Sequence, residues 1–300
     1  MSANDASDTQ NQAEDIEIYI STLPQQPSWR PSPNLYKYQG FWCFSNFLKG
    51  IILFQKNFIP QPNDFLLCST PKSGTTWLKS LSIAISTRSN SPQSDPNLLL
   101  TNPPHQITHV PFDSLPKSIL NSNTKLIYVC RNPKDVLVSM WHFVSGKNKH
   151  IQQLTFQEGY EKFCNGVSAY GPYWDHVLGY WKASLEFPDR VLFLKYEDMM
   201  DDTCIYVKKM ADFMGCPFSV DEEKQGMVEK IVELCSFESL SNLEVNKSKN
   251  ISSHMALRIE NNEFFRKGKV GDWKNYFTDE MAKKLDQITH HKFSGFGLYV

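Results

Sequence analysis

Three short apolar segments, each followed by a helical pattern, dominate the hydrophobic pattern of the chain. They are DFLLCS at 64–69, KLIYVC at 125–130 and RVLFLKY at 190–196. Their apolar residues are continuous and do not alternate with polar ones, as expected for parallel strands that are covered on both faces. The order of strands and helices indicates an α/β fold with a central, mostly parallel sheet flanked by helices.

Helix signals follow the first two segments. Trp77, Leu81 and Ala84 recur at helical spacing, which predicts a helix that packs on the sheet. Asn132 and Pro133 have the positions of a cap and a first-turn residue for the second helix. The other expected helices cover 199–213, stopped by Gly215 and Pro217, then 221–236, and the residues after a cap at Thr278.

Composition favours one large folded unit. Of the 300 residues, 41% are apolar and 13% aromatic, which is enough to bury a large core. Residues 1–25 are polar and acidic and are predicted to form a disordered tail, which leaves 26–300 as a single domain. The polar stretches 145–160 and 238–262 are predicted to be long loops, and such loops often act as lids.

Charge and cysteine content argue against several classes of protein. With 31 basic and 32 acidic residues the net charge is -1, so no long-range field would attract nucleic acid or an anionic membrane. Seven cysteines without a CxxC pair argue against a disulfide framework and a zinc site. The N-terminus resembles no signal peptide, and no apolar run has membrane-spanning length. We therefore expect a cytoplasmic protein that binds neither nucleic acid nor membrane.

The stretch STPKSGTTWLKS at 69–80 joins the first strand to its helix and contains residues that could bind an anion. A helix N-terminus offers unpaired N–H groups and a partial positive charge. Gly74 lets the backbone approach a ligand, and Lys72 adds a full charge. The hydroxyl donors are Ser73, Thr75 and Thr76. Because the lysine precedes the glycine, the usual nucleotide loop of kinases is disfavoured, while a capped turn with a solvated lysine remains an alternative.

Two further basic elements lie along the chain. Arg131 follows the second strand, and Ser139 lies two turns into the next helix. Ligands of open parallel sheets bind outside the carboxyl ends of the strands, so Arg131 should share a crevice with Lys72. The segment 266–274, RKGKVGDWK, is rich in cations and glycine. Taken singly, Arg131 could pair with a local carboxylate and the later segment could be a surface turn.

Three motifs, TPKSGTTWLKSL, YVCRNPKDVLVSMWHF and RKGKVGDWKNYF, occur in this order and strongly resemble the cytosolic sulfotransferases; YQGFW with LLCSTPKSGTTWLK is similar to their plant branch. The similarity covers residues 35–300. These enzymes move a sulfuryl group from 3′-phosphoadenosine 5′-phosphosulfate (PAPS) to a hydroxyl or amine of a small acceptor. The resemblance implies a strand, loop and helix that bind PAPS much as a P-loop binds phosphate. It also implies two anion sites and a reaction without a metal.

The resemblance implies a role for each candidate residue. His109, in THVP, matches the catalytic base, and Lys72 would stabilise the leaving phosphate. Ser139 would bind the 3′-phosphate and tether Lys72 until the acceptor arrives. A neutral imidazole suits proton removal near pH 7, although a lone histidine is more often structural. His105 and His142 are the rival bases.

The implied PAPS ligands fall into three groups. Residues 72–76 match the loop for the 5′-phosphosulfate. The 3′-phosphate ligands are Arg131, Ser139, Arg266, Lys267 and Gly268. The aromatic residues around the nucleoside are Trp77, Tyr196 and Phe237, of which Trp77 and Phe237 could instead be ordinary core residues. Cys235 occupies a position where the family usually has a threonine, which weakens one nucleotide contact.

The acceptor is the least determined part of the interpretation. Phe41, Trp42, Tyr170 and Tyr173 are candidate walls for a flat acceptor, though each could belong to the core. Plant relatives act on flavonols, steroids, hydroxylated jasmonates and desulfoglucosinolates, and the aromatic residues favour a phenolic acceptor. Two other functions stay open: a small-molecule kinase that uses ATP and Mg²⁺ at the same loop, and a non-catalytic nucleotide-binding protein.

The segment after the last motif bears on assembly. Animal members of the family often dimerise through KxxxTVxxxE, and this chain has KNYFTDEMAK from Lys274. Asp279 replaces the valine, and Lys283 or Lys284 replaces the final glutamate. The sequence therefore predicts a monomer.

Overall fold

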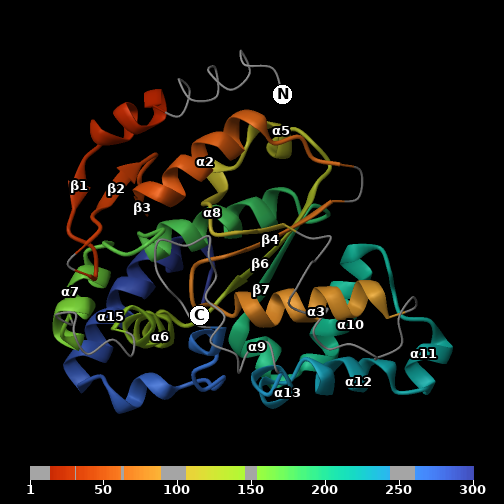
Figure 1. Ribbon diagram of the computed structural model, residues 1–300. Helices are drawn as coiled ribbons and strands as arrows, with labels where there is room; N and C mark the ends of the chain where they lie inside the picture. The colour runs from red at the N-terminus through yellow and green to blue at the C-terminus, as the bar shows by residue number, and fades with distance from the viewer. Residues whose placement is uncertain (1–13, 31, 62–63, 89–105, 146–153, 244–260) are drawn as a thin grey trace.

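A four-stranded parallel sheet forms the centre of the protein (Figure 1). The computed structural model describes residues 14–30, 32–61, 64–88, 106–145, 154–243 and 261–300. The strand order is β5-β4-β6-β7, and all neighbours pair in parallel. The strands are β4 (Phe65–Ser69), β5 (Gln106–Thr108), β6 (Lys125–Cys130) and β7 (Val191–Lys195). The predicted fold class is confirmed, although the short and polar β5 is not recognisable from the apolar pattern.

Helices cover both faces of this sheet (Figure 1). In β4, Leu66 and Cys68 belong to one buried cluster and Leu67 to the other, because successive side chains point to opposite faces. The first cluster includes residues of α2 (Ser45–Asn57), α6 (Pro133–Ser145), α8 (Tyr173–Glu186) and α15 (Asp279–Phe293). The second includes residues of α3 (Thr75–Thr87), α10 (Thr203–Met214) and α12 (Met227–Leu234). Burial on both faces explains why the strands are continuously apolar.

The predicted helix boundaries agree with the capping contacts. The Lys134 backbone N–H donates to Asn132 Oδ1 at 3.0 Å at the start of α6, and the Met281 N–H donates to Thr278 Oγ1 at 3.2 Å at the start of α15. Gly215 ends α10 in a left-handed conformation with φ 78°.

Two long helices that the pattern predicts are each divided in two. The segment predicted over 199–213 consists of α9 (Tyr196–Asp201) and α10, because the Asp202 side chain caps α10 by accepting the Ile205 N–H. The segment predicted over 221–236 consists of α11 (Val220–Lys224) and α12, which left-handed Gly226 separates. Local capping residues thus override the longer hydrophobic repeat.

A small antiparallel sheet and a helix come before the central sheet. Its strands are β1 (Gln25–Gln26), β2 (Leu35–Tyr38) and β3 (Phe41–Phe44), in that order. Residues 14–21 are helical and bury Ile16 and Ile20 in the first core cluster. The prediction of disorder over 1–25 is therefore wrong for 14–25, while 1–13 lie outside the described residues.

The two predicted long loops contain short helices. α7 (Phe156–Cys164) begins at a capping box formed by Thr155 and Glu158, and α13 (Phe237–Ser241) begins the second stretch. Within those stretches, residues 146–153 and 244–260 lie outside the described residues. The other short elements are η1 (Phe112–Ser114), α5 (Lys117–Leu120), η2 (Asn261–Phe264), η3 (Asp272–Asn275) and η4 (Ser294–Phe296). Over the described ranges, none of the helices has both the length and the apolar character to cross a bilayer.

Candidate active site

The carboxyl ends of the four parallel strands lie along one edge of the sheet, and each is followed by a candidate residue. His109 follows β5, Lys72 follows β4, Arg131 follows β6 and Tyr196 follows β7. The chain order reverses at β4, which has β5 on one side and β6 on the other. Open α/β sheets bind ligands at such a switch point, so the sequence prediction of a shared crevice agrees with the topology.

The loop between β4 and α3 has a conformation that requires glycine. Gly74 has φ 105°, and a Cβ atom there would lie 2.8 Å from Tyr196 Cδ2. Lys72 is also left-handed, with φ 70°. Within the loop, the Thr70 and Ser73 hydroxyls are 2.5 Å apart. The backbone therefore turns tightly around Lys72 and brings the start of α3 against Tyr196.

The N-terminus of α3 is open to an anion. Its N-cap residue, Gly74, provides no capping side chain, and its first turn has no acidic residue. The Thr75 hydroxyl lies 2.6 Å from the Ser69 hydroxyl, which links the helix start to the end of β4. Thr76 and Trp77 follow in the same turn and are partly buried. The free N–H groups and the helix dipole suit a phosphosulfate.

Lys72 lies among aromatic rings and other cations. Its Nζ is 4.1 Å from the centroid of Phe143 and 5.5 Å from that of Phe264. Burial lowers the Lys72 pKa to about 7, and the positive charges of Arg266 and Arg131 contribute to this shift, against a smaller opposing effect of Glu263. The three basic elements that the sequence singles out are therefore electrostatic neighbours.

Three features around Lys72 differ from the sequence interpretation or extend it. Ser139 is buried two turns into α6, but among the described contacts no hydrogen bond joins its hydroxyl to Lys72. The aromatic neighbours Phe143 and Phe264 are not among the site residues that the sequence predicts. Phe143 lies one helical turn after Ser139, and Phe264 precedes the Arg266 motif, so spacing from known candidates could have found both.

His109 is a partly buried imidazole in a defined tautomer. Its Nδ1 lies 2.8 Å from the Ser69 carbonyl oxygen, which can only accept, so Nδ1 carries the proton. The Nε2 atom of the neutral ring therefore has a free lone pair. Burial lowers the pKa of His109, the positive charge of Lys72 lowers it further, and the bond to Ser69 opposes both. The ring is thus neutral at pH values where an ordinary histidine begins to protonate.

A second histidine, His176, is hydrogen-bonded to the backbone of His109. His176 Nε2 donates to the His109 carbonyl at 2.9 Å, and the Tyr128 hydroxyl donates to His176 Nδ1 at 3.0 Å. Burial lowers the pKa of His176 to about 4, so it is neutral under ordinary conditions. Sequence reasoning missed this pair, because a histidine and a tyrosine inside apolar segments carry no distinguishing pattern.

Of the two rival bases, one can be described. His142 Nε2 lies 2.8 Å from the Tyr276 hydroxyl on the segment after η3, which gives the imidazole a structural partner. His105 lies outside the described residues.

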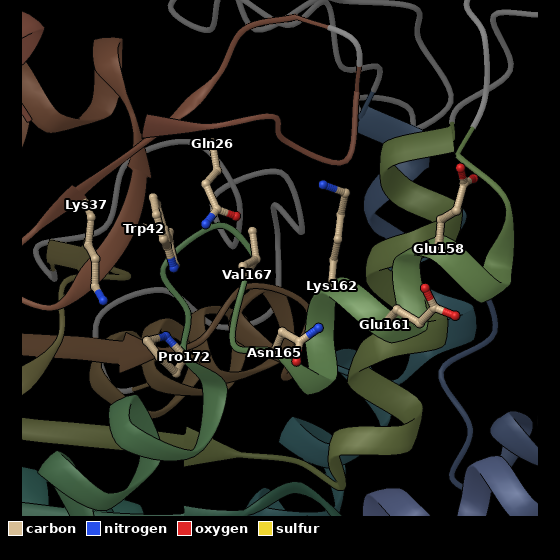
Figure 2. Close-up of a pocket in the computed structure, with 9 residues that line it drawn as sticks. All are labelled: Gln26, Lys37, Trp42, Glu158, Glu161, Lys162, Asn165, Val167 and Pro172. Atoms are coloured by element: carbon tan, nitrogen blue, oxygen red, sulfur yellow. The ribbon is translucent and has the colours of Figure 1, made fainter. Parts of the chain in front are cut away.

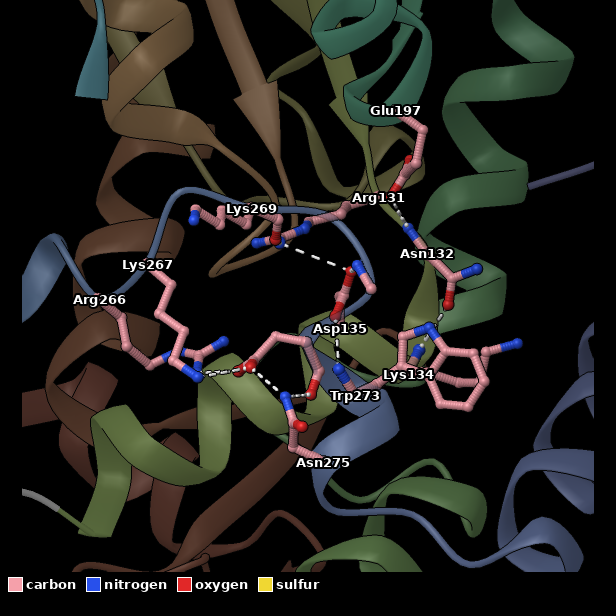
Figure 3. Close-up of polar contacts among 12 residues, drawn as sticks. Arg131, Asn132, Lys134, Asp135, Glu197, Arg266, Lys267, Lys269, Trp273 and Asn275 are labelled. Atoms are coloured by element: carbon pink, nitrogen blue, oxygen red, sulfur yellow. Dashed lines mark hydrogen bonds and ion pairs between the residues drawn. The ribbon is translucent and has the colours of Figure 1, made fainter. Parts of the chain in front are cut away.

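The two distant basic segments touch each other (Figure 3). Arg131 Nη2 donates to the Lys269 carbonyl at 2.7 Å, and its guanidinium lies 4.4 Å from the Tyr196 ring. The Nε atoms of Arg131 and Arg266 are buried and have no hydrogen-bond partner in the described part of the chain. Buried donors without partners are rare, so two of them among converging arginines fit an anionic ligand such as a phosphate.

Two carboxylates organise this cluster, and sequence reasoning missed both. Asp272 pairs with Arg266 and with Lys267, whose Nζ is 2.6 Å from Asp272 Oδ1. Burial would raise the Asp272 pKa, but hydrogen bonds from Lys267, Arg266 and Asn275 outweigh it and lower that pKa. Asp135 accepts backbone N–H groups of the same segment. Across the described ranges no group of three or more His, Cys, Asp or Glu side chains is arranged to hold a metal ion.

The aromatic candidates for the nucleoside lie around the two glycine turns. The rings of Trp77 and Tyr196 meet edge to face at 5.4 Å. Phe237 is 39% exposed and covers Gly268, where a Cβ atom would lie 2.3 Å from its ring. Cys235 is fully buried in the second core cluster, and burial raises its pKa to about 12, so its thiol does not line an open site.

Two of the four predicted acceptor walls lie near His109. The Tyr170 ring is 5.4 Å from the His109 ring, and the Phe41 ring is 6.1 Å from the supporting His176. Phe47, which sequence reasoning missed, is 6.2 Å from Tyr170. These rings form an apolar environment beside the candidate base.

The other two predicted walls lie elsewhere. Trp42 follows Phe41 on β3 and so points to the opposite side, where it packs with Leu35 and Val167 and lines a separate cavity of about 620 Å³ (Figure 2). Tyr173 is 2% exposed, and its hydroxyl donates to the Arg131 carbonyl. Tyr173 thus supports the end of β6 instead of facing an acceptor.

Comparisons with known proteins agree with this geometry. A family model described as "Sulfotransferase domain" matches residues 93–297. A flavonol 4′-sulfotransferase of Flaveria chlorifolia is 48% identical over 97% of this chain and 98% of its own length. Cytosolic sulfotransferase 17 of Arabidopsis thaliana is 44% identical over 93% of this chain and 88% of its own.

Solved structures show the same fold. An Arabidopsis thaliana protein assigned to the steroid sulphotransferases has a TM-score of 0.70 and 33% identity, with 94% of each chain covered. Mouse sulfotransferase SULT7A1, solved in complex with PAP, has a TM-score of 0.68 and 27% identity, with 88% of this chain and 95% of that chain covered. The chain therefore belongs to the sulfotransferase family and is a PAPS-dependent sulfotransferase.

Proposed function

We propose that this sulfotransferase acts on a hydroxyl of a planar phenolic acceptor of the flavonol type, with His109 as the base. The observation that carries this proposal is the bond from His109 Nδ1 to Ser69, which leaves the Nε2 lone pair free beside aromatic residues. The names of relatives such as the flavonol 4′-sulfotransferase of Flaveria chlorifolia support the acceptor class. Phe41, Phe47 and Tyr170 would provide its apolar walls.

The chemical step is an in-line displacement at sulfur. His109 Nε2 accepts the proton of the acceptor hydroxyl while the oxygen of that hydroxyl forms a bond to sulfur. The bond from sulfur to the bridging oxygen breaks, and its electron pair stays on the leaving nucleotide. Lys72 and the N-terminus of α3 stabilise that developing charge. Positioning and charge stabilisation, as in phosphoryl transfer, provide most of the rate.

The donor would lie across the strand ends. The loop 72–76 would bind the 5′-phosphosulfate, and Arg131 with Ser139 and the 266–268 turn would bind the 3′-phosphate. Trp77, Tyr196 and Phe237 would surround the nucleoside. The convergence of Arg131 with Lys269 supports this placement. The two alternatives, a small-molecule kinase and a non-catalytic nucleotide-binding protein, are not favoured, because the chain belongs to the sulfotransferase family.

An acceptor panel with labelled PAPS tests the acceptor class. Flavonols that differ in their free hydroxyls, a hydroxysteroid and a simple phenol would be compared by kcat/KM. We expect the flavonols to be the best acceptors, because the walls near His109 are flat and aromatic. A higher kcat/KM for the steroid would contradict the acceptor assignment and leave the donor site intact.

Two variants test the residue roles. His109→Ala should lower turnover by about 10²- to 10⁴-fold with PAP affinity nearly unchanged. Lys72→Ala should lower the rate of the chemical step by about 10²-fold or more. His290→Ala, at an exposed position of α15, is the control and should keep full activity. Normal turnover of His109→Ala together with an inactive His105→Ala would show that the base is misassigned.

We also propose that the protein is a cytosolic monomer. The printed names of relatives such as cytosolic sulfotransferase 17 support the location. The charged residues Asp279, Lys283 and Lys284 at positions of the animal dimer contact support the monomer. Sedimentation velocity at micromolar concentration tests it, and a species of twice the 34.6 kDa chain mass would contradict it.

A further inference from the structure

One buried carboxylate joins the two basic elements of the proposed 3′-phosphate site (Figure 3). Asp135, in the first turn of α6, is fully buried. Its Oδ2 accepts the Gly271 N–H at 2.7 Å, and its Oδ1 accepts the Trp273 N–H at 3.0 Å. Both oxygens therefore hold the backbone of the segment 266–273 against α6.

Asp135 is connected to three candidate phosphate ligands. Arg131 Nη2 lies 3.7 Å from Asp135 Oδ2. Asp272, between the two bonded amides, pairs with both Arg266 and Lys267. Asp135 thus contacts the first cation directly and reaches the other two through the backbone that carries Asp272.

The charge of Asp135 alone cannot explain its position. A carboxylate beside a phosphate site repels the ligand, and burial of the charge costs free energy unless its oxygens are bonded. Its benefit must then be geometric, since two amides of one segment hold both oxygens in a fixed orientation. We propose that Asp135 is a positioning residue that sets Arg266 and Lys267 for the 3′-phosphate of the donor. This inference rests on the proposed donor site.

Asp135→Asn tests the inference with little change in shape. The amide oxygen can still accept one N–H, but the amide nitrogen faces the other N–H and cannot accept it. The Kd values for PAP and for AMP, which lacks the 3′-phosphate, are measured by calorimetry on the full chain. We expect PAP affinity to fall by about tenfold or more and AMP affinity to change by less than about twofold. The KM for PAPS should rise, with kcat nearly unchanged.

Two controls separate positioning from a general loss of stability. Asp286→Asn removes the exposed partner of Lys134 at the same end of α6, and should keep the PAP-to-AMP affinity ratio of the unaltered protein. In an Arg266→Ala, Lys267→Ala background, Asp135→Asn should lower PAP affinity much less than it does alone, because the groups that it positions are absent.

Several outcomes would overturn the inference. Equal losses of PAP and AMP affinity would show a merely structural role, and additivity with the double alanine variant would show that Asp135 does not act through those cations. If Asp135→Asn does not fold, Asp272→Asn is used instead, because it weakens the ion pairs through which the segment held by Asp135 orients Arg266 and Lys267. A PAP-to-AMP ratio that is unchanged in Asp272→Asn would then refute the inference. An unaltered protein that binds PAP no better than AMP would instead refute the proposed 3′-phosphate site itself.

Discussion

At the residue scale, the neighbours of Lys72 have opposite effects on the stability of its positive charge. The ring faces of Phe143 and Phe264 stabilise the ammonium, while burial and the nearby arginines destabilise it and lower its pKa to about 7. The negative charge of a phosphosulfate bound beside Lys72 in the loop 72–76 would oppose the second effect and raise the Lys72 pKa. Lys72 would then take up a proton as the donor binds, and be fully charged for the transfer step.

We predict that Lys72 in the ligand-free protein titrates near pH 7 and that Arg266→Ala raises this midpoint. The reason is that Arg266 repels the Lys72 ammonium, so its removal favours the charged form. NMR of labelled lysine side chains measures both midpoints. Arg88→Ala, which removes an arginine bonded to Glu222 at the far end of α3, is the control and should leave the Lys72 midpoint in place. A midpoint near 10.5 in the unaltered protein would contradict the prediction.

A second residue-scale prediction concerns the buried His176. Its folded-state pKa of about 4 lies below the ordinary value of 6.5, so between these values the unfolded chain binds the proton and the folded chain does not. The stability due to neutral His176 is fully present above pH 6.5 and is lost as the pH falls towards 4. Between about pH 7 and about pH 5 this loss amounts to about 2 kcal/mol.

His176→Gln should remove that part of the pH dependence, because glutamine can donate and accept hydrogen bonds but does not titrate. Urea unfolding of both proteins at the two pH values measures the difference. Tyr128→Phe is the matched control. It removes the bond to His176 Nδ1 and keeps the buried imidazole, so it should lower stability at both pH values and retain the steep loss. An unchanged pH dependence in His176→Gln would show that other groups cause the acid sensitivity.

At the element scale, two glycine turns place aromatic rings against the backbone of the donor site. The turn at Gly74 lies against Tyr196, and the turn at Gly268 lies against Phe237. In each case a Cβ atom would meet the ring at less than normal contact distance, and the backbone is left-handed. Backbone conformation and ring placement therefore depend on one another.

We predict that Gly268→Ala lowers both stability and PAP affinity. The φ of 61° costs about 1 to 2 kcal/mol for an alanine, and the new methyl group must displace Phe237. Gly297→Ala is a matched control with φ 67°, where an added methyl group would meet no atom within 4 Å, so it should cost only the backbone strain. Chemical unfolding and calorimetry measure the two effects. A Gly268→Ala variant that is no less stable than Gly297→Ala would contradict the clash.

The elements also show how far the sequence can be interpreted. The strands at 64–69, 125–130 and 190–196 were predictable because burial on both faces leaves continuous apolar runs. β5 was not, because three residues on a sheet edge leave no such run. The start of α6 was predictable from Asn132 and Pro133, whereas the division between α9 and α10 depends on a single capping contact of Asp202.

The site shows the same division between local and non-local information. Lys72, Arg131 and Arg266 could be named as candidates because each belongs to a motif that lies next to a strand end or a glycine turn and that resembles the sulfotransferases. Asp135 and His176 could not, because their roles arise from contacts with residues more than 60 positions away. Trp42 was predicted to line the acceptor site together with Phe41, but successive side chains of β3 point to opposite sides, so Trp42 packs with Leu35 and Val167 instead. Without knowing that 41–44 form a strand, the sequence does not show that these neighbours face apart.

At the scale of the whole molecule, the proposed donor site draws on distant parts of the chain. The loop after β4, the start of α6, the start of α9 and the turn before η3 are brought together by the strand order and by the bonds of Asp135. A ligand with both a 5′ and a 3′ anion would contact all four. A ligand with only the 5′ group would reach the loop after β4 and would not join it to the C-terminal turn.

We therefore predict that PAP and AMP protect different parts of the chain from amide hydrogen exchange. PAP should slow exchange in 70–80, in 131–139 and in 264–273, because its 3′-phosphate ties the C-terminal turn to α6. AMP should slow exchange mainly in 70–80. Exchange measured by mass spectrometry at matched fractional saturation distinguishes the two patterns. Equal protection by both nucleotides in 264–273 would mean that this turn responds to the nucleoside and not to the 3′-phosphate, and the assignment of Arg266 and Lys267 would then be wrong.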